Sequence, residues 1–467
     1  MSLLSLSSLR RFHPHAAYAA KRASVFAVAA VACFCMTVQP VLAQAISLIT
    51  DDETLQLLKD YEDPIYRAAG LDPAALHIYL VNDPEINAFA AGGQNIFVNT
   101  GLFMKLDTPN EVIGVLAHET GHIAGGHLTR GSVAASKASI PMLVAMAAGV
   151  AAMIAGAGSA GMGVFMLGQQ VAQGQFNAFS RAQEGTADQM GQKYLRATKQ
   201  SGRGMLKTFQ KLADEEAMSA YRIDAWARSH PASRERIAEL EDIIEKSPYK
   251  DVPDSPESLR RFAMVKAKLF GFTADVDVVL RKYPPGDESA PARYARAIAY
   301  MRKPDLAKAQ SEIKSLIAEH PDNPFFHQVL GQIYVNMAKP ELGVPSLQKA
   351  SDLYPEGTEI RVELAAAQLA TENVKYAQPA LDNLKVALQK ESDNAFAWYE
   401  TALAYSMLNN EPMANLATAE RYYSIGAYPQ AQRFASIAQR GLSQGTPDWQ
   451  RANDIISISA AEKKNRD

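Results

Sequence analysis

Residues His118 to His122 read His-Glu-Thr-Gly-His, a spacing that can hold a metal ion and activate water. On a helix, the imidazoles of His118 and His122 are one turn apart on the same face, so both can bind one ion. Glu119 follows the first histidine and can reach a water at that ion without being a ligand, which suits a general base. Zinc lowers the pKa of such a water towards neutrality, so the motif predicts a metallopeptidase.

A tetrahedral catalytic zinc site needs a third protein ligand and an open position. The sequence offers His127, Glu184 and His230. His127 is a poor candidate, because the metzincin pattern places its third histidine ten residues after the first, which is Leu128 here. Glu184 would complete a His-His-Glu set, and Asp188, one turn further along, could accept a hydrogen bond from a ligand histidine. The alternatives are a solvated acidic face for Glu184 and a core or capping role for His230.

The helix that must carry the motif has its own start signal. Thr108 to Glu111 (Thr-Pro-Asn-Glu) is a capping box with proline at the first helical position, and apolar residues follow it. In the neighbouring segments, apolar residues recur at helix or strand spacing, and this predicts the other elements of a catalytic domain. We expect a helix over 51–66, strands over 76–81, 88–90 and 96–98, a hairpin turn at Gly92 and Gly93, and a helix over 181–197.

The first 43 residues have the parts of a secretory signal, with basic residues before an uncharged apolar run over 23–38 and a small-residue cleavage site at 41–43. Cleavage after Ala43 removes four cations, so the formal net charge changes from −3 to −3 − 4 = −7. It also removes Cys33 and Cys35, the only cysteines, which predicts an exported chain without disulfides or a thiol nucleophile. A permanent N-terminal anchor and lipidation at Cys33 are the alternatives.

Composition excludes some classes of function. The chain has 467 residues, of which 48% are hydrophobic and 21% charged, which is typical of a folded protein with about two or three domains. Its net charge provides no basic field for nucleic acid.

Residues 139–174 are apolar and rich in Ala, Gly and Met, and we expect a mobile lid or a hairpin that contacts a membrane surface there. A transmembrane helix over 139–168 is the alternative, because the segment is long enough to span.

The C-terminal part of the chain reads as a helical repeat. Tyr300 and Tyr334 are 34 residues apart, and so are Pro321 and Pro355. Small residues and aromatics recur at tetratricopeptide positions, which lets paired helices pack closely. The matches are Leu330, Gly331 and Tyr334 in one copy, Trp398, Ala402 and Tyr405 in another, and residues 419–438 in a third. We therefore divide the chain into a signal (1–43), a metallopeptidase domain (44–247), a linker (248–259) and a tetratricopeptide-repeat domain (260–467).

Three segments occur in a recognisable order: His118 to His122, Ser180 to Asp188, and His230-Pro231 with Arg236. On these residues the chain resembles the zinc metallopeptidase family of prenyl-protein endopeptidases, membrane heat-shock proteases and periplasmic β-barrel assembly-enhancing proteases. The resemblance covers nearly all of the mature chain. It implies an α+β zincin-like domain, mostly helical with a small sheet, followed by an all-α tetratricopeptide-repeat domain.

The resemblance also assigns roles. The Glu-x-x-x-Asp signature falls on Glu184 and Asp188, which implies Glu184 as the third ligand of one zinc ion per chain and Asp188 behind the ligands. His230 would stabilise the tetrahedral intermediate or occupy the open position and hold the enzyme idle, and Arg236 would pair with an acidic residue. Asn87, Ala88, Phe89 and Ala90 resemble the family's strand beside the active site, which would align the substrate backbone.

The function implied is an endopeptidase of the periplasm, peripheral to the outer membrane, that degrades misfolded or stalled outer-membrane β-barrel proteins and assists their assembly. The repeat arm would dock on the barrel-assembly machinery, and no nucleic acid is involved. Two alternatives remain. One is a tetratricopeptide assembly chaperone or adaptor with minor proteolytic activity, and the other is an integral inner-membrane protease, which would require residues 142–167 to span.

Overall fold

The structure is a computed structural model, which describes residues 47–127, 180–218, 230 and 233–466. Nearly all of this lies in one compact unit, Leu48–Asp467. The predicted signal (1–43) and the apolar segment 139–174 lie outside the described residues. Within the part that is described, no helix has the length and apolar character needed to cross a membrane.

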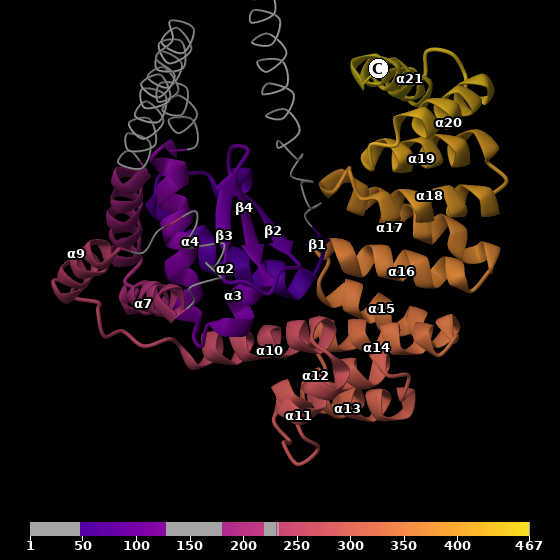
Figure 1. Ribbon diagram of the computed structural model, residues 1–467. Helices are drawn as coiled ribbons and strands as arrows, with labels where there is room; N and C mark the ends of the chain where they lie inside the picture. Colours follow the sequence, from indigo (N-terminus) through magenta and orange to yellow (C-terminus); the bar gives the residue numbers. More distant parts are fainter. Residues whose placement is uncertain (1–46, 128–179, 219–229, 231–232, 467) are drawn as a thin grey trace, which may run out of the picture. The chain divides into compact units, whose positions relative to one another are not determined.

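A four-stranded mixed sheet forms one wall of the catalytic domain (Figure 1). Its strands are β1 (Leu48–Ile49), β2 (His77–Val81), β3 (Ala88–Ala91) and β4 (Asn95–Asn99), in the order β1-β2-β4-β3. The predicted hairpin is confirmed: β3 pairs antiparallel with β4, and Gly92 and Gly93 take φ values of 57° and 101° in its turn. β4 pairs parallel with β2, so β3 lies at the edge of the sheet.

Helix α4 (Pro109–Ala124) carries the His-Glu-Thr-Gly-His motif and contacts β3, α2 and α7 (Figure 1). Its start is the predicted capping box, in which the Thr108 hydroxyl accepts the Glu111 N–H and the Glu111 carboxylate accepts the Asp107 N–H. The surrounding elements are α2 (Asp52–Ala68), the short helices η1 (Pro73–Ala75) and α3 (Thr100–Lys105), helical residues 180–197, α7 (Arg203–Met218) and α9 (Arg234–Glu245).

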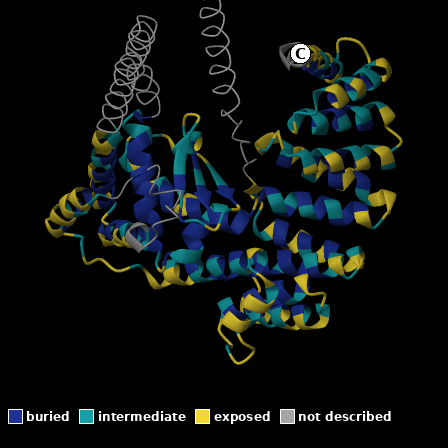
Figure 2. Cartoon of the chain, viewed as in Figure 1, coloured by how far each residue is buried: buried dark blue, intermediate teal, exposed yellow. Residues whose placement is uncertain are grey.

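Helix α4 is buried over most of its length (Figure 2). Two glycines allow its neighbours to approach closely. A Cβ at Gly114 would lie 2.6 Å from the Met205 backbone, and one at Gly121 would lie 2.6 Å from the Ala187 carbonyl oxygen. The second contact brings the helix with Glu184 against the motif. Leu57, Ile96, Val115, Leu116 and Phe209 belong to the hydrophobic core around them.

The remaining chain is an array of paired helices (Figure 1). α12, α14 and α16 begin at residues 290, 324 and 358, which gives the predicted period of 34. A Cβ at Gly331 would lie 2.5 Å from Leu347, so this glycine allows α14 and α15 to pack closely. The fold class predicted from the sequence is confirmed. The helices are α10 (Pro256–Thr273), α11 (Val276–Lys282), α12 (Ala290–Arg302), α13 (Leu306–Glu319), α14 (Pro324–Asn336), α15 (Pro340–Leu353), α16 (Thr358–Ala370), η2 (Val374–Tyr376), α17 (Ala377–Lys390), α18 (Ala395–Met407), α19 (Glu411–Ser424), α20 (Tyr428–Gly441) and α21 (Pro447–Arg466).

The segment between the two regions differs in detail from the predicted linker 248–259. It is irregular only up to Ser255, whose hydroxyl caps α10 at the Ser258 N–H, and Pro256 then begins the helix. Phe262, Val265 and Leu269 of α10 belong to the catalytic domain's hydrophobic core. The domain limits themselves stay a prediction.

Candidate metal centre

Four buried side chains from three segments converge on one point. His118 and His122 come from α4, Glu184 from helical residues 180–197, and His230 from the segment before α9. One candidate donor atom of each lies within 4.8 Å of the others. The sequence had named all four, and the i, i+4 spacing of α4 does place both imidazoles on one face.

The spacing of the donor atoms fits a tetrahedral ion. His118 Nε2 is 3.1 Å from His122 Nε2 and 3.3 Å from His230 Nδ1. The Glu184 carboxylate lies 3.4 Å from both motif histidines and 3.0 Å from His230 Nδ1. Two ligands bound at about 2.0–2.1 Å to a tetrahedral zinc ion lie roughly 3.3 Å apart. The donors therefore have the chemistry and the separation that a divalent metal requires.

A second layer of side chains orients the donors. Asp188 Oδ1 lies 2.8 Å from His118 Nδ1, the ring nitrogen that faces away from the donor cluster. Arg236 contacts Asp188 through Nε at 2.8 Å and reaches Glu184 through Nη1 at 3.1 Å. Phe209 of α7 packs edge-on against His118 and lies under the Arg236 guanidinium. Such contacts fix the orientation of a ligand imidazole.

Glu119 lies beside the donors and is held from the sheet. Its Oε2 accepts the Ala90 N–H at 3.0 Å, and its Oε1 is 3.7 Å from His230 Nε2. Ala90 is in β3, so the side of this edge strand that faces away from β4 faces the catalytic helix. A carboxylate in this place can take a proton from a water between it and the donors.

Burial and mutual contact set the protonation of the cluster when no ion is bound. Burial lowers the pKa of a histidine, but hydrogen bonds to Asp188 and Glu184 outweigh it and raise the pKa of His118 to about 9. Burial and the neighbouring charge of His118 lower the pKa of His122 to about 2. Although burial opposes it, hydrogen bonds with His118 and His230 hold the pKa of Glu184 well below its usual range. Without an ion, the cluster thus holds a protonated His118, a neutral His122 and an ionised Glu184 near neutral pH.

Several contacts at the centre have no signal in the sequence. His127, rejected as a third ligand, lies with its Nδ1 3.0 Å from His122 Nδ1, on the opposite side of that ring from the donors. The Ala90 amide and the Phe209 ring were also not predicted. Each depends on a long-range approach of chain segments, although a glycine within the motif helix was a hint that another helix packs there.

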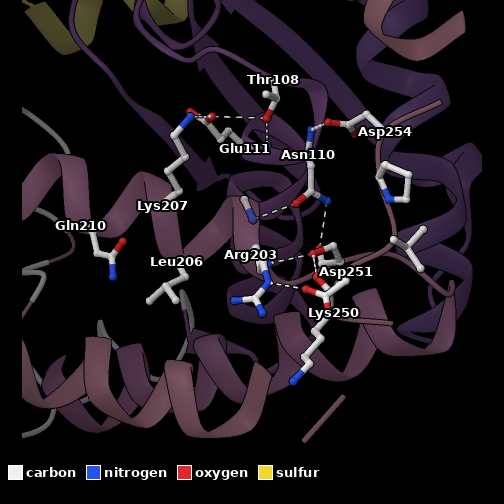
Figure 3. A pocket seen from close by; sticks show the side chains of 14 residues that line it. Thr108, Asn110, Glu111, Arg203, Leu206, Lys207, Gln210, Lys250, Asp251 and Asp254 are labelled. Carbon is white, nitrogen blue, oxygen red and sulfur yellow. Dashed lines mark hydrogen bonds and ion pairs between the residues drawn. The ribbon is translucent and has the colours of Figure 1, made fainter. Parts of the chain in front are cut away.

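A separate cavity of about 550 Å³ lies at the other end of α4, around its first turn and the start of α7 (Figure 3). Asn110 bridges its walls, since its Nδ2 donates to the Ser201 carbonyl and its Oδ1 accepts the Gly204 N–H. Arg203 pairs there with Asp251, and Lys207 pairs with Glu111. Residues 250–254, from the segment before α10, line one side of this cavity, and none of the candidate catalytic residues lines it.

Comparison with known proteins agrees with this geometry. Residues 53–244 match the model of peptidase family M48. The β-barrel assembly-enhancing protease of Escherichia coli (strain K12) is 24% identical over 409 residues, which cover 85% of this chain and 81% of that protein. Metalloprotease LoiP of the same organism is 33% identical over 172 residues, 36% of this chain and 62% of LoiP. YrrB, a tetratricopeptide-repeat protein of solved structure, aligns with 37% of this chain and 89% of its own at 20% identity and a TM-score of 0.31.

Residues 53–244 are thus similar to the peptidases of family M48, and the chain is a metalloendopeptidase that acts on polypeptides. This agrees with the enzyme class predicted from the motif. The role of each site residue stays a prediction. These residues are Glu119, Glu184, Asp188, His230, Arg236 and the strand 87–90.

Proposed function

We propose that the chain is a zinc-dependent endopeptidase of the bacterial periplasm that degrades misfolded or stalled outer-membrane β-barrel proteins and assists their assembly. The observation that carries the zinc assignment is the convergence of three imidazoles and one carboxylate at tetrahedral spacing. This donor set favours zinc over harder cations such as Mg²⁺ or Ca²⁺. The substrate class and the location are supported by the name of the E. coli relative and by the predicted signal.

His118, His122 and Glu184 would hold the ion, with Asp188 and Arg236 orienting them. When bound, zinc would act as a Lewis acid that polarises the scissile carbonyl and makes water nucleophilic near neutral pH. Glu119, fixed by the Ala90 N–H, would accept the proton of the attacking water and later pass it to the leaving amine. The edge strand β3 would pair with an extended substrate beside Glu119 and bring the substrate backbone to it.

His230 occupies the fourth corner of the donor set, where a catalytic site keeps an open position. We propose that it holds the enzyme in a resting state and must leave before a substrate carbonyl can approach. His230→Ala tests this role. A rise in peptidase activity supports a resting ligand, a strong fall supports stabilisation of the intermediate, and no change removes His230 from the site.

The test of the metal site is elemental analysis of the purified mature chain and of Glu184→Ala. We expect about one zinc per chain, lost in the variant. Zinc that is retained in Glu184→Ala would point to His230 as the third ligand. The absence of zinc from both proteins would overturn the zinc assignment.

One observation favours the second candidate function, an assembly chaperone or adaptor that binds through the array. Phe396, Tyr399 and Leu403 lie along one face of α18 and are 53%, 44% and 40% exposed. Such a row of apolar side chains can take part in protein binding, and we propose the barrel-assembly machinery as a partner of the array. Glu119→Gln separates the two functions, since an adaptor would keep its main role in cells while an endopeptidase would not.

A further inference from the structure

Glu62 lies behind the catalytic helix, on the face of α2 that packs against α4. Its side chain is 0% exposed, and its Oε1 accepts a hydrogen bond from the hydroxyl of Thr120, which is also fully buried. Thr120 follows the general base Glu119. With 3.6 residues per turn, it lies on the side of α4 opposite His118 and His122. Glu62 therefore contacts the catalytic helix from behind the metal centre.

The surroundings of Glu62 favour an uncharged carboxyl. No cation pairs with it among the described residues, and the two charged groups that face it are Glu119 of α4 and Asp63 of its own helix. Tyr66, one turn further along α2, adds only a buried hydroxyl. Burial without a counter-ion raises the pKa of Glu62 to about 8. A leucine would fill a similar volume without desolvating a carboxyl, so packing alone does not explain an acid here.

We propose that Glu62 is a positioning residue for the general base: its uncharged carboxyl holds Thr120 and, with it, the backbone that carries Glu119. This inference rests on the proposed role of Glu119. Glu119 is fixed from the front by the Ala90 N–H at 3.0 Å, and the Thr120–Glu62 hydrogen bond fixes the adjoining residue from the back. An ionised Glu62 would still accept the Thr120 hydrogen bond, but it would place a second negative charge behind Glu119 and repel the Glu119 carboxylate.

The first experiment removes the hydrogen bond from each side. In the zinc-loaded full chain, Glu62→Leu and Thr120→Val should each lower kcat about tenfold on an unfolded β-barrel protein, the effect of a lost buried hydrogen bond. KM and zinc content should stay unchanged. The double variant should lose no more than either single variant, because both remove the same contact. Asp60→Asn, a change two residues earlier on α2 at a largely exposed ion pair with Arg261, is the matched control.

The second experiment separates positioning from packing. Glu62→Gln keeps an uncharged acceptor for Thr120, so it should recover most of the kcat that Glu62→Leu loses. We expect the wild-type kcat to decline as pH rises through about 8, where Glu62 ionises, and we expect Glu62→Gln to lack this decline because Gln cannot ionise. A purely structural role would change thermal stability and leave the shape of the pH profile as in the wild type.

Two outcomes overturn the proposal. One is a Glu62→Leu or Thr120→Val enzyme with wild-type kcat, and the other is a Glu62→Gln enzyme whose pH profile matches the wild type. If Glu62→Leu does not fold, Thr120→Val and Glu62→Gln still decide the question. Failure of the proposed function would look different. The wild-type enzyme itself would then show no proteolysis, or Glu119→Gln would cleave as fast as the wild type.

Discussion

The metal centre and the contact between α2 and the helical array both bury charged side chains, and they differ in the source of the compensating charge. At the metal centre, His118, His122, Glu184 and His230 point lone pairs at one place. At the array contact, the chain supplies its own cation. Lys268 of α10 is 2% exposed, and its Nζ lies 2.5 Å from Asp51 Oδ1 and 3.3 Å from Glu53 Oε2.

The array contact also uses carboxylates in a way that the metal centre does not. Asp52, in the first turn of α2, accepts the backbone N–H groups of Thr358 and Ile360 at 3.1 and 3.0 Å. It thereby caps α16, whose own N-cap residue, Gly357, has no side chain to do so. Tyr294 donates to Glu53 at 2.9 Å. These charges are satisfied within the chain, whereas the metal centre is completed by an ion from solution, and the two regions should respond differently to metal removal and to mutation.

Metal removal gives the largest expected difference between the two regions. Chelation of the zinc-loaded chain should abolish proteolysis and lower its stability by about 2.7 kcal/mol relative to zinc at a hundred times its dissociation constant. Hydrogen exchange at the Thr358 and Ile360 amides should not change, because Asp52 and Lys268 need no ion. Exchange that rises at these amides on chelation would show that the two clusters are not independent.

Lys268→Met tests the array contact directly. It leaves Asp51 and Glu53 buried without a cation, so we expect a loss of about 3–5 kcal/mol in the free energy of unfolding by urea. Lys303→Met is the control. It breaks the ion pair between Lys303 and Asp277, two side chains that are each more than half exposed, so it should lower the free energy of unfolding by less than about 1 kcal/mol. Zinc content at native conditions should be that of the wild type. A loss as small as that of the control would mean that solvent already reaches Lys268.

Gly357→Ala disturbs the cap without removing any charge. The new Cβ would lie 2.7 Å from Asp52 Oδ2, so either the cap or the backbone must move, at a cost of about 1–3 kcal/mol. The amides of Thr358 and Ile360 should exchange faster. Gly286→Ala, where a Cβ meets nothing within 4 Å, is the matched control. Unchanged exchange in Gly357→Ala would show that Asp52 does not cap α16 in solution.

Local sequence signals predicted the elements of both regions better than their contacts. The capping box at Thr108, the motif spacing and the hairpin glycines are short-range patterns, and the structure has α4, β3 and β4 where they predict them. The parallel pairing of β2 with β4 and the Ala90–Glu119 hydrogen bond depend on how distant segments pack, which periodicity does not encode. For this reason the sequence did not predict the β2–β4 pairing or the Ala90–Glu119 hydrogen bond.

The array shows the same limit. The period of 34 residues predicted its helices, but Lys268 reads as a surface residue of a repeat and is buried against the catalytic domain. α10 opens in the predicted linker because Ser255 and Pro256 form a helix start, and its apolar face joins the catalytic core through Phe262 and Val265. A local pattern gives a helix and its apolar face, while the neighbour that covers this face is decided by tertiary structure.

A further contrast is a pH dependence at the edge of the array contact. Burial raises the pKa of Glu363 to about 7, although Gln328 and Gln332 both donate hydrogen bonds to it. Nearby charges are Lys268, Asp52 and Glu359. Since the folded-state pKa exceeds the ordinary glutamate pKa of 4.5, the folded chain binds more protons between these two pH values. The stability from uncharged Glu363 is then present below about 4.5 and lost as pH rises through about 7.

Glu363→Gln keeps the group uncharged at every pH, so its free energy of unfolding should fall less steeply than that of the wild type over this range. Urea unfolding of both proteins near the two ends of the range measures the difference, and Glu341→Gln, an exposed glutamate on α15, controls for loss of a charge. The difference should be the same with and without zinc, because none of the groups facing Glu363 is a metal donor. Parallel pH slopes for wild type and variant would show that Glu363 is already ionised in the folded chain.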